Sequence, residues 1–264
     1  MFDEVPTGEI RRCSECSKEF EHVAIMMNGK DIDSENHVCP ECRPAFEEKE
    51  RQERDKQEEE ERQKAYRAKR LKSWERTIPV LYRDTDPGHT DYPLRIHDKA
   101  MSWMNSTLSN ESEPSPFFGL IGTTGKCKTR ISSQVLKRAI LAGRSTEWIN
   151  ATEFQRLVQS QWSSSPTETS PLASKSVTVG EQAKKRLDFM RNCDVLALDD
   201  LGKGRLTETV AGAIYDILEE RASRKLAIIW TSNATPDSLL NMLPKDSGGP
   251  IVRRLIEFSL IIRL

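Results

Sequence analysis

The stretch Phe117–Thr129 reads FFGLIGTTGKCKT, and it decides the fold that we expect for this chain. Its apolar start, Phe117–Ile121, predicts a buried strand, and a helix is expected from about Lys128. Backbone N–H groups of a tight loop between a strand and a helix can surround an anion at the helix N-terminus. The stretch therefore predicts a phosphate-binding loop, although a glycine-containing turn without a ligand would also fit these residues.

From the predicted loop we expect ATP and Mg²⁺ as cofactors. We expect Lys128 to reach the β- and γ-phosphates and the Thr129 hydroxyl to bind Mg²⁺. Cys127 departs from the usual pattern, which has glycine before the lysine so that the backbone can approach the nucleotide. Weak turnover is therefore one expectation from this sequence. The candidate nucleotide-binding residues of the loop are Gly122, Thr123, Thr124, Gly125, Lys126, Cys127, Lys128 and Thr129.

A second apolar run, Val195–Leu198, ends in the two carboxylates Asp199 and Asp200. An acid at the carboxyl end of a buried strand can hold Mg²⁺, and the next acid can polarise an attacking water. We assign the magnesium to Asp199 together with Thr129, and the catalytic base to Asp200. The alternative is that both acids simply cap the turn at Gly202.

A third apolar run, Leu226–Trp230, is followed closely by Asn233. In a parallel sheet the loop after this strand lies beside the phosphate site, so Asn233 could hydrogen-bond the γ-phosphate or the attacking water. It also fits a plain turn. Arg253 and Arg254 lie on a predicted short helix, where an arginine could reach the nucleotide of a neighbouring subunit or belong to an exposed basic face.

Strands and amphipathic helices alternate through the second half of the chain, which predicts an α/β fold with a parallel sheet covered by helices on both faces. A polar surface loop is expected at 105–116 and a flexible insertion at 162–176. Helices are expected around 94–104 and from about Lys128, Thr152 and Glu208. The expected strands are 117–121, 146–149, 195–198, 226–231 and 258–262.

Four segments together resemble the Walker A, Walker B, sensor 1 and arginine-finger elements of DnaC-like helicase loaders and IstB-like transposition ATPases: Gly122–Thr129, Leu198–Gly202, Thr231–Asn233 and Ile251–Leu255. The resemblance extends from about Ile78 to the last residue. It implies an AAA+ core of five parallel strands, ATP-dependent assembly into a homo-oligomer, and binding of single-stranded DNA. It also implies a replicative helicase or another protein as partner. By position, Arg254 matches the arginine finger better than Arg253 because it directly precedes the leucine.

Two C-x-x-C pairs lie near the N-terminus, Cys13 with Cys16 and Cys39 with Cys42. Four thiolates at this spacing can surround Zn²⁺, and so short a segment has too little core to fold without it. Free thiols or a redox pair are the alternatives. A hairpin turn at Asn28-Gly29 completes a predicted zinc-ribbon-like module over residues 1–44, which could contact a protein partner or nucleic acid.

Residues 45–77 are almost entirely charged or amide side chains without glycine, which predicts a solvated helix. It lacks a sustained apolar seam, so we favour a free or loosely packed helix over a coiled coil. The predicted organisation is a zinc module at 1–44, a charged helical linker at 45–77 and an AAA+ P-loop ATPase domain at 78–264.

Composition limits the classes of function. The 264 residues contain 40 Lys and Arg against 41 Asp and Glu, so overall charge gives no sign of nucleic-acid binding. No apolar run reaches the roughly 20 residues that span a bilayer, so we expect a cytoplasmic protein without membrane contact. We favour a replication helicase loader. A transposition helper ATPase and a zinc-dependent nucleotide-sensing adaptor with little hydrolysis remain as alternatives.

Overall fold

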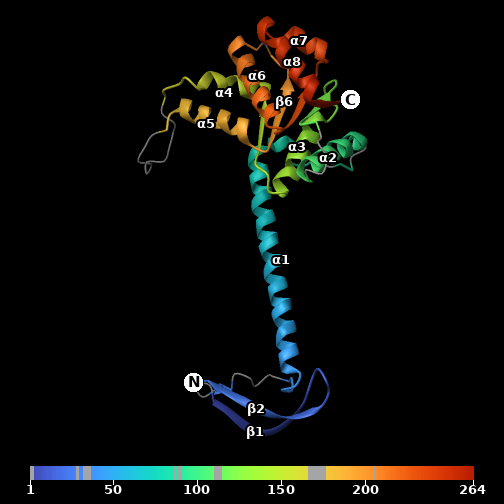
Figure 1. Ribbon diagram of the computed structural model, residues 1–264, viewed down its shortest axis with the longest axis vertical. Coiled ribbons are helices and arrows are strands. Elements are labelled where there is room, and N and C mark those ends of the chain that lie inside the picture. The colour runs from blue at the N-terminus through green and yellow to red at the C-terminus, as the bar shows by residue number, and fades with distance from the viewer. Residues whose placement is uncertain are drawn as a thin grey trace. The chain divides into compact units, whose positions relative to one another are not determined.

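The computed structural model describes residues 3–27, 30–31, 37–85, 87–88, 91–109, 115–165, 177–204 and 206–264. It divides into two compact units, Met1–Tyr66 and Arg67–Leu264, each of which is described by itself below. Figure 1 labels the main helices and strands. Among the described residues, no helix combines the length and the apolar character needed to cross a membrane.

The first unit contains a small antiparallel sheet of β1 (Asp3–Arg12), β2 (Glu19–Met27) and β3 (Lys30–Asp31), in that order. β2 and β3 pair antiparallel, and the predicted turn at Asn28-Gly29 lies outside the described residues. β1 was not predicted, because its sequence DEVPTGEIRR is polar and contains proline and glycine. These two residues lie at an irregularity in register between Pro6 and Ile10. β1 pairs with β2 both before and after this irregularity.

Helix α1 (Arg43–Thr77) is the long charged helix that the sequence predicts. Trp74 is its buried residue, and it belongs to the second unit, which begins at Arg67. The Trp74 indole donates a hydrogen bond to the Ser133 carbonyl at 3.1 Å, and the Lys137 ammonium lies 4.7 Å from the centre of the ring. The last turns of α1 are thus fixed by specific contacts, while most of its other residues are exposed.

The second unit is built on a five-stranded parallel sheet. Its order is β5 (Thr146–Asn150), β6 (Val195–Leu201), β7 (Ala227–Ser232), β4 (Phe117–Ile121) and β8 (Ser259–Arg263). Every pair of neighbours is parallel. The first strand of this sheet in the sequence, β4, therefore lies between β7 and the edge strand β8, and the carboxyl ends of β6, β7 and β4 lie side by side.

Helices cover both faces of this sheet, so the predicted α/β fold is confirmed. Neighbouring strand residues face opposite apolar clusters: Phe117 and Leu196 belong to one, Phe118 and Ala197 to the other. The Phe118 face is covered by α2 (Leu94–Ser109) and α3 (Lys128–Leu141), with the short helix η1 (Val80–Tyr82) beside them. The Phe117 face is covered by α4 (Ala151–Ser160), α5 (Val179–Asn192), α6 (Glu208–Ser223), α7 (Pro236–Met242) and α8 (Lys245–Phe258).

Two details of the second unit differ from the sequence analysis. Residues 105–109 continue α2 instead of starting the predicted loop, and 110–114 lie outside the described residues. Helices α5 and α7 were not predicted, although each has an N-cap signal. Thr178 forms a reciprocal capping box with Glu181, and Thr235 accepts a hydrogen bond from the Ser238 N–H ahead of α7. Most of the predicted insertion, 166–176, lies outside the described residues.

Candidate functional site

The loop between β4 and α3 needs unusual backbone at several positions. A Cβ on Gly122 would lie 2.6 Å from the Leu264 carbonyl oxygen, so only glycine fits there. Gly125 and Cys127 have positive φ angles of 87° and 56°. A glycine is therefore favoured before Lys128 by the left-handed backbone as well as by the close approach of a ligand, and Cys127 adopts this conformation at a steric cost.

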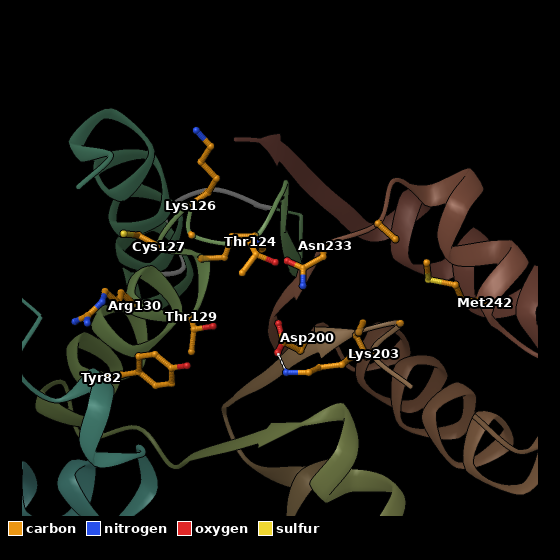
Figure 2. Close-up of a pocket in the computed structure, with 15 residues that line it drawn as sticks. Tyr82, Thr124, Lys126, Cys127, Thr129, Arg130, Asp200, Lys203, Asn233 and Met242 are labelled. Carbon is orange, nitrogen blue, oxygen red and sulfur yellow. Dashed lines mark hydrogen bonds and ion pairs between the residues drawn. The ribbon is translucent and has the colours of Figure 1, made fainter. Parts of the chain in front are cut away.

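The Cys127 side chain packs at the edge of the apolar cluster that contains Tyr92. In Figure 2 its sulfur points away from Asp200 and Asn233. The thiol therefore leaves the interior of the site open. The departure from glycine affects the backbone of the loop more than the space above it.

Lys128 begins α3 and is 5% exposed. Its ammonium group donates to the carbonyl oxygens of Gly122 at 2.7 Å and Thr123 at 2.8 Å. Burial lowers the pKa of Lys128, and the nearby charges of Asp200 and Asp199 oppose that shift. The lysine thus crosses beneath the loop, where two carbonyls hold its charge.

Asp199 lies beside Thr129, although the two are 70 residues apart in the sequence. The Thr129 hydroxyl donates to the Asp199 carboxylate at 2.9 Å, and the Thr231 hydroxyl donates to it at 2.7 Å. Burial raises the pKa of Asp199 to about 6, although both hydrogen bonds act in the opposite direction. The carboxylate is held in a buried polar cluster where a cation would relieve the cost of its charge.

Asp200 has a different environment from its neighbour. β6 loses its regular pairing with β7 between Leu198 and Leu201, and Asp200 has a φ of 59°. Its N–H donates to the Thr231 hydroxyl at 2.9 Å, and its carboxylate pairs with the Lys203 ammonium at 3.1 Å. The irregularity turns the second acid out of the sheet, toward the open side of the site.

A cavity of about 510 Å³ opens above these residues. Figure 2 shows the side chains around it, with Asp200, Asn233 and Thr124 facing one another across the opening. Of the predicted residues, Thr124, Gly125, Lys126, Cys127, Lys128, Thr129, Asp200 and Asn233 line this cavity. Gly122, Thr123 and Asp199 are not in the lining, but they contact it through Lys128 and Thr129. The Lys126 side chain points away, so Lys126 offers the site its backbone.

Arg254 does not line the cavity. Its guanidinium is paired with Glu219 of α6, donating at 3.1 Å from Nη2, and with Glu257 at 3.1 Å from Nη1. The neighbouring Arg253 has a side chain that is 79% exposed. A contact from Arg254 to another subunit would first require it to leave Glu219.

Several lining residues were missed by sequence reasoning. Lys203 and Tyr82 are far from any phosphate-loop pattern, and Arg130 directly follows it. Thr231 was quoted only as part of a motif, yet it joins both acids through one hydroxyl. A lysine between two glycines, Gly202-Lys203-Gly204, was the available signal for Lys203, because such glycines permit a tight return of the chain.

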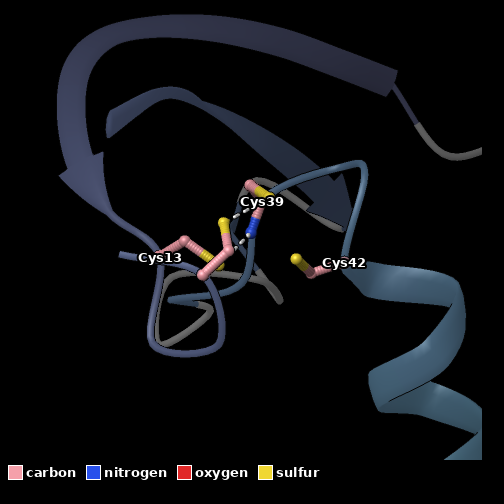
Figure 3. A group of neighbouring side chains, drawn as sticks. Cys13, Cys39 and Cys42 are labelled. Atoms are coloured by element: carbon pink, nitrogen blue, oxygen red, sulfur yellow. Dashed lines mark hydrogen bonds between the residues drawn. The ribbon is translucent and has the colours of Figure 1, made fainter. Parts of the chain in front are cut away.

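The four predicted zinc ligands lie together in the first unit. The sulfur atoms of Cys13, Cys16, Cys39 and Cys42 are all within 4.8 Å of one another. Figure 3 shows labelled thiols gathered where β1 ends and α1 begins. The Cys39 N–H donates to the Cys13 sulfur at 3.3 Å, and this bond is the largest of several hydrogen bonds that together lower the pKa of the Cys13 thiol to about 6.

The cysteine cluster has dimensions suited to a metal. Tetrahedral zinc with Zn–S bonds near 2.3 Å needs sulfur atoms roughly 3.8 Å apart. Cys16 and Cys39 have theirs 3.7 Å apart. All four cysteines are free of disulfides, and a backbone N–H already favours the thiolate at Cys13. The donor set therefore fits Zn²⁺ with no position left for a substrate.

No protein-family model and no curated protein matches the sequence. Solved structures do match in fold. A replication initiator DnaA bound to AMPPCP and single-stranded DNA has a TM-score of 0.50 at 17% identity, covering 68% of this chain and 51% of that chain. A DNA replication initiation factor has a TM-score of 0.50 at 14% identity, covering 69% and 50%. DnaI has a TM-score of 0.49 at 22% identity, covering 70% and 94%.

The two likenesses with a TM-score of 0.50 concern the fold. The chain spans about half the length of the first two proteins. At these identities the likeness shows the fold alone, which is an α/β fold shared with these two replication initiation proteins. The site described above lies at the carboxyl edge of that sheet, where open α/β folds bind ligands.

Proposed function

We propose that this chain is an ATP-hydrolysing protein of the DnaC-like group. Its N-terminal zinc module would recognise its partners. The observation that carries the proposal is the contact of Thr129 with Asp199 at 2.9 Å, directly below a loop that opens α3. The loop hydroxyl and the buried acid at the end of β6 lie close enough to bind one cation together. The loop N–H groups above them suit phosphate.

The residues have separate tasks in this proposal. Thr129 and Asp199 would hold Mg²⁺, whose positive charge would offset the negative charge of the phosphates. Lys128 would exchange its two carbonyl acceptors for phosphate oxygens. Asn233 would orient a water, and Asp200 would accept the water proton as oxygen bonds to the γ-phosphorus and the bond to the β-phosphate oxygen breaks.

The proposed partners are a replicative helicase or another protein, and single-stranded DNA. The sequence resemblance supports them, as does the fold shared with an initiator whose structure contains single-stranded DNA. ATP would drive assembly of a cytoplasmic homo-oligomer, in which Arg254 exchanges Glu219 for the nucleotide of the next subunit. A transposition helper ATPase would use the same residues, and the zinc module favours the replication role because it provides an adaptor.

Zn²⁺ would be structural in this proposal. Cys13, Cys16, Cys39 and Cys42 would close its coordination, so it supplies folding energy and no catalysis. The module would then present β1 and β2 to a protein partner. Nucleic acid is the other class of ligand that the module could bind, through its basic residues Arg11, Arg12, Lys18 and Arg43.

Steady-state ATPase activity of the zinc-replete chain, with and without single-stranded DNA, tests the proposal. We expect DNA to stimulate turnover. Lys128→Ala and Asp200→Asn should each lower it by at least about a hundredfold, as expected for loss of a phosphate contact or a general base. Equal turnover in the wild type and both variants would contradict the proposal.

One alternative function has a specific observation in its favour. Cys127 in a left-handed backbone could slow catalysis enough that the chain binds ATP as a nucleotide-sensing adaptor without hydrolysing it. Tight ATP binding without turnover in the wild type would select the adaptor. A large rise in turnover of Cys127→Gly would then identify this residue as the cause.

A further inference from the structure

The loop between β6 and α6 reverses direction, so that Lys203 lies beside Asp200. Gly202 and Gly204 have φ angles of 88° and 87°, and the Lys203 N–H donates to the Asp200 carbonyl at 3.0 Å. This tight turn brings the Lys203 ammonium to 3.1 Å from the Asp200 carboxylate. The backbone thus aims a lysine at the acid to which we assign the catalytic proton.

Lys203 also lines the cavity that contains Lys128, Thr129 and Asn233. Figure 2 shows its ammonium against the Asp200 carboxylate, joined to it by a dashed line. The Lys203 side chain is 65% exposed and that of Asp200 is 24% exposed. The ion pair therefore lies at the mouth of the site, unlike Lys128, which is buried beneath the loop.

We propose that Lys203 is a second phosphate-binding lysine that exchanges Asp200 for the terminal phosphate of a nucleoside triphosphate. The inference rests on the proposed function and deepens it, because it gives the same site a way to distinguish triphosphate from diphosphate. Without nucleotide, the Lys203 ammonium forms an ion pair with the Asp200 carboxylate. With a triphosphate, the lysine moves to the γ-phosphate oxygens and the carboxylate is free to accept the proton of the attacking water.

Relative charge favours this exchange. An ion pair as exposed as Lys203 with Asp200 is weak because water screens it. A terminal phosphate offers three charged oxygens, and hydrogen bonds to ionised acceptors are shorter and stronger than neutral ones. A diphosphate has no group at that position, so the lysine would stay on Asp200. Its flexible four-carbon stem lets the ammonium move between two acceptors on the same cavity.

The test is equilibrium binding of AMPPCP and of ADP, each with Mg²⁺, to the full chain and its variants. We expect Lys203→Ala to weaken AMPPCP binding about tenfold, the effect of one charge-assisted hydrogen bond, and to leave ADP binding unchanged. Lys203→Arg should restore most of the loss. Lys99→Ala, at an exposed position on α2, is the matched control and should change neither affinity.

A second arm measures the competition between the two acceptors. Asp200→Asn should tighten AMPPCP binding by releasing Lys203, and this gain should shrink in the Asp200→Asn, Lys203→Ala double variant. A gain of equal size with and without the lysine would come from removal of the acid charge alone. That result would overturn the exchange.

The possible outcomes separate the inference from the proposed function. Equal AMPPCP affinities of wild type and Lys203→Ala, or a matching loss for ADP, would overturn the role of Lys203 while leaving a nucleotide site in place. If the wild type binds neither nucleotide, the proposed function fails and the inference fails with it. Selective loss of AMPPCP, rescued by arginine, supports both.

Discussion

The two units of this chain differ in what stabilises each of them internally. The first unit has a small apolar cluster of Cys13, Val38 and Cys39, and two of these three are predicted zinc ligands. The second unit buries apolar residues on both faces of a five-stranded sheet, with Phe118 and Leu196 fully enclosed on opposite faces. The comparison suggests that one unit depends on a metal to fold, while the other is stable enough to carry strained backbone at its site.

The largest expected effect is on the first unit. Cys39→Ser should remove zinc and unfold this unit, because structural zinc contributes on the order of 10 kcal/mol to such small folds. The β1–β2 pairing would be lost, and limited proteolysis within residues 3–31 together with metal analysis would detect it. Cys127→Ser is the control, since this cysteine lies outside the cluster and should keep zinc bound. An intact, protease-resistant first unit without zinc would contradict the claim that this unit depends on a metal to fold.

The second largest effect is expected in the second unit. Phe118→Ala should cost about 3–5 kcal/mol, because the side chain is 0% exposed and packs against Trp103 with ring centres 5.2 Å apart. Urea unfolding followed by tryptophan fluorescence measures the loss. Phe189→Ala is the matched control, because Phe189 is 42% exposed on α5 and its removal should cost little. Loss of zinc from Phe118→Ala would contradict independent stabilisation of the two units.

A polar contact in the second unit should give a pH-dependent effect. Burial acts to raise the pKa of Asp194, but hydrogen bonds from the Ser145 hydroxyl at 2.6 Å and N–H at 2.7 Å hold it below its usual value. A lowered pKa in the folded state stabilises the fold above the unfolded pKa, and this contribution is lost as pH falls through the folded pKa. Asp194→Asn should therefore destabilise the unit by about 1 kcal/mol near neutral pH, after allowance for solvent screening.

The pH dependence of that difference is the measurement. Urea unfolding from pH 7 down to pH 3 should show the gap between wild type and Asp194→Asn shrinking below about pH 4, near the usual pKa of aspartate. Asp188→Asn, whose side chain is 69% exposed, should show a much smaller gap throughout. A constant gap for Asp194→Asn would mean that the charge of this carboxylate is irrelevant.

The smallest expected effect concerns the strained loop. Cys127→Gly should stabilise the second unit by up to about 1 kcal/mol, because glycine adopts the φ of 56° without steric cost and loses little packing. Lys225→Gly, at a φ of 53° far from the loop in sequence, should also relieve strain but leave ATP turnover unchanged. Destabilisation by Cys127→Gly would show that packing of the thiol outweighs backbone strain.

The sequence predicted the sheet better than it predicted the site. Strands such as Phe117–Ile121 are continuous apolar runs with both faces buried, so their pattern is visible without the fold. β1 is polar and forms only because β2 provides its hydrogen bonds, and sequence periodicity therefore missed it. The start of α5 depends on a capping box at Thr178, a short signal beside a long polar stretch.

Within the site, loop residues near a motif were predicted and those brought in by backbone geometry were not. Lys203 reaches Asp200 because two glycines reverse the chain, and Thr231 joins both acids because β6 is irregular beside it. Neither fact can be read from spacing. The roles of Asp200, Asn233 and Arg254 stay predictions, and Arg254 is bound to Glu219 within its own chain.

The most direct test of the account measures zinc content and ATP turnover in the same preparations of the full chain. We predict that Cys39→Ser loses zinc but keeps basal turnover, and that Lys128→Ala keeps one zinc per chain but loses turnover. This double dissociation would assign the metal to the first unit and the nucleotide chemistry to the second. Loss of basal turnover together with zinc, or wild-type turnover in Lys128→Ala, would contradict the account.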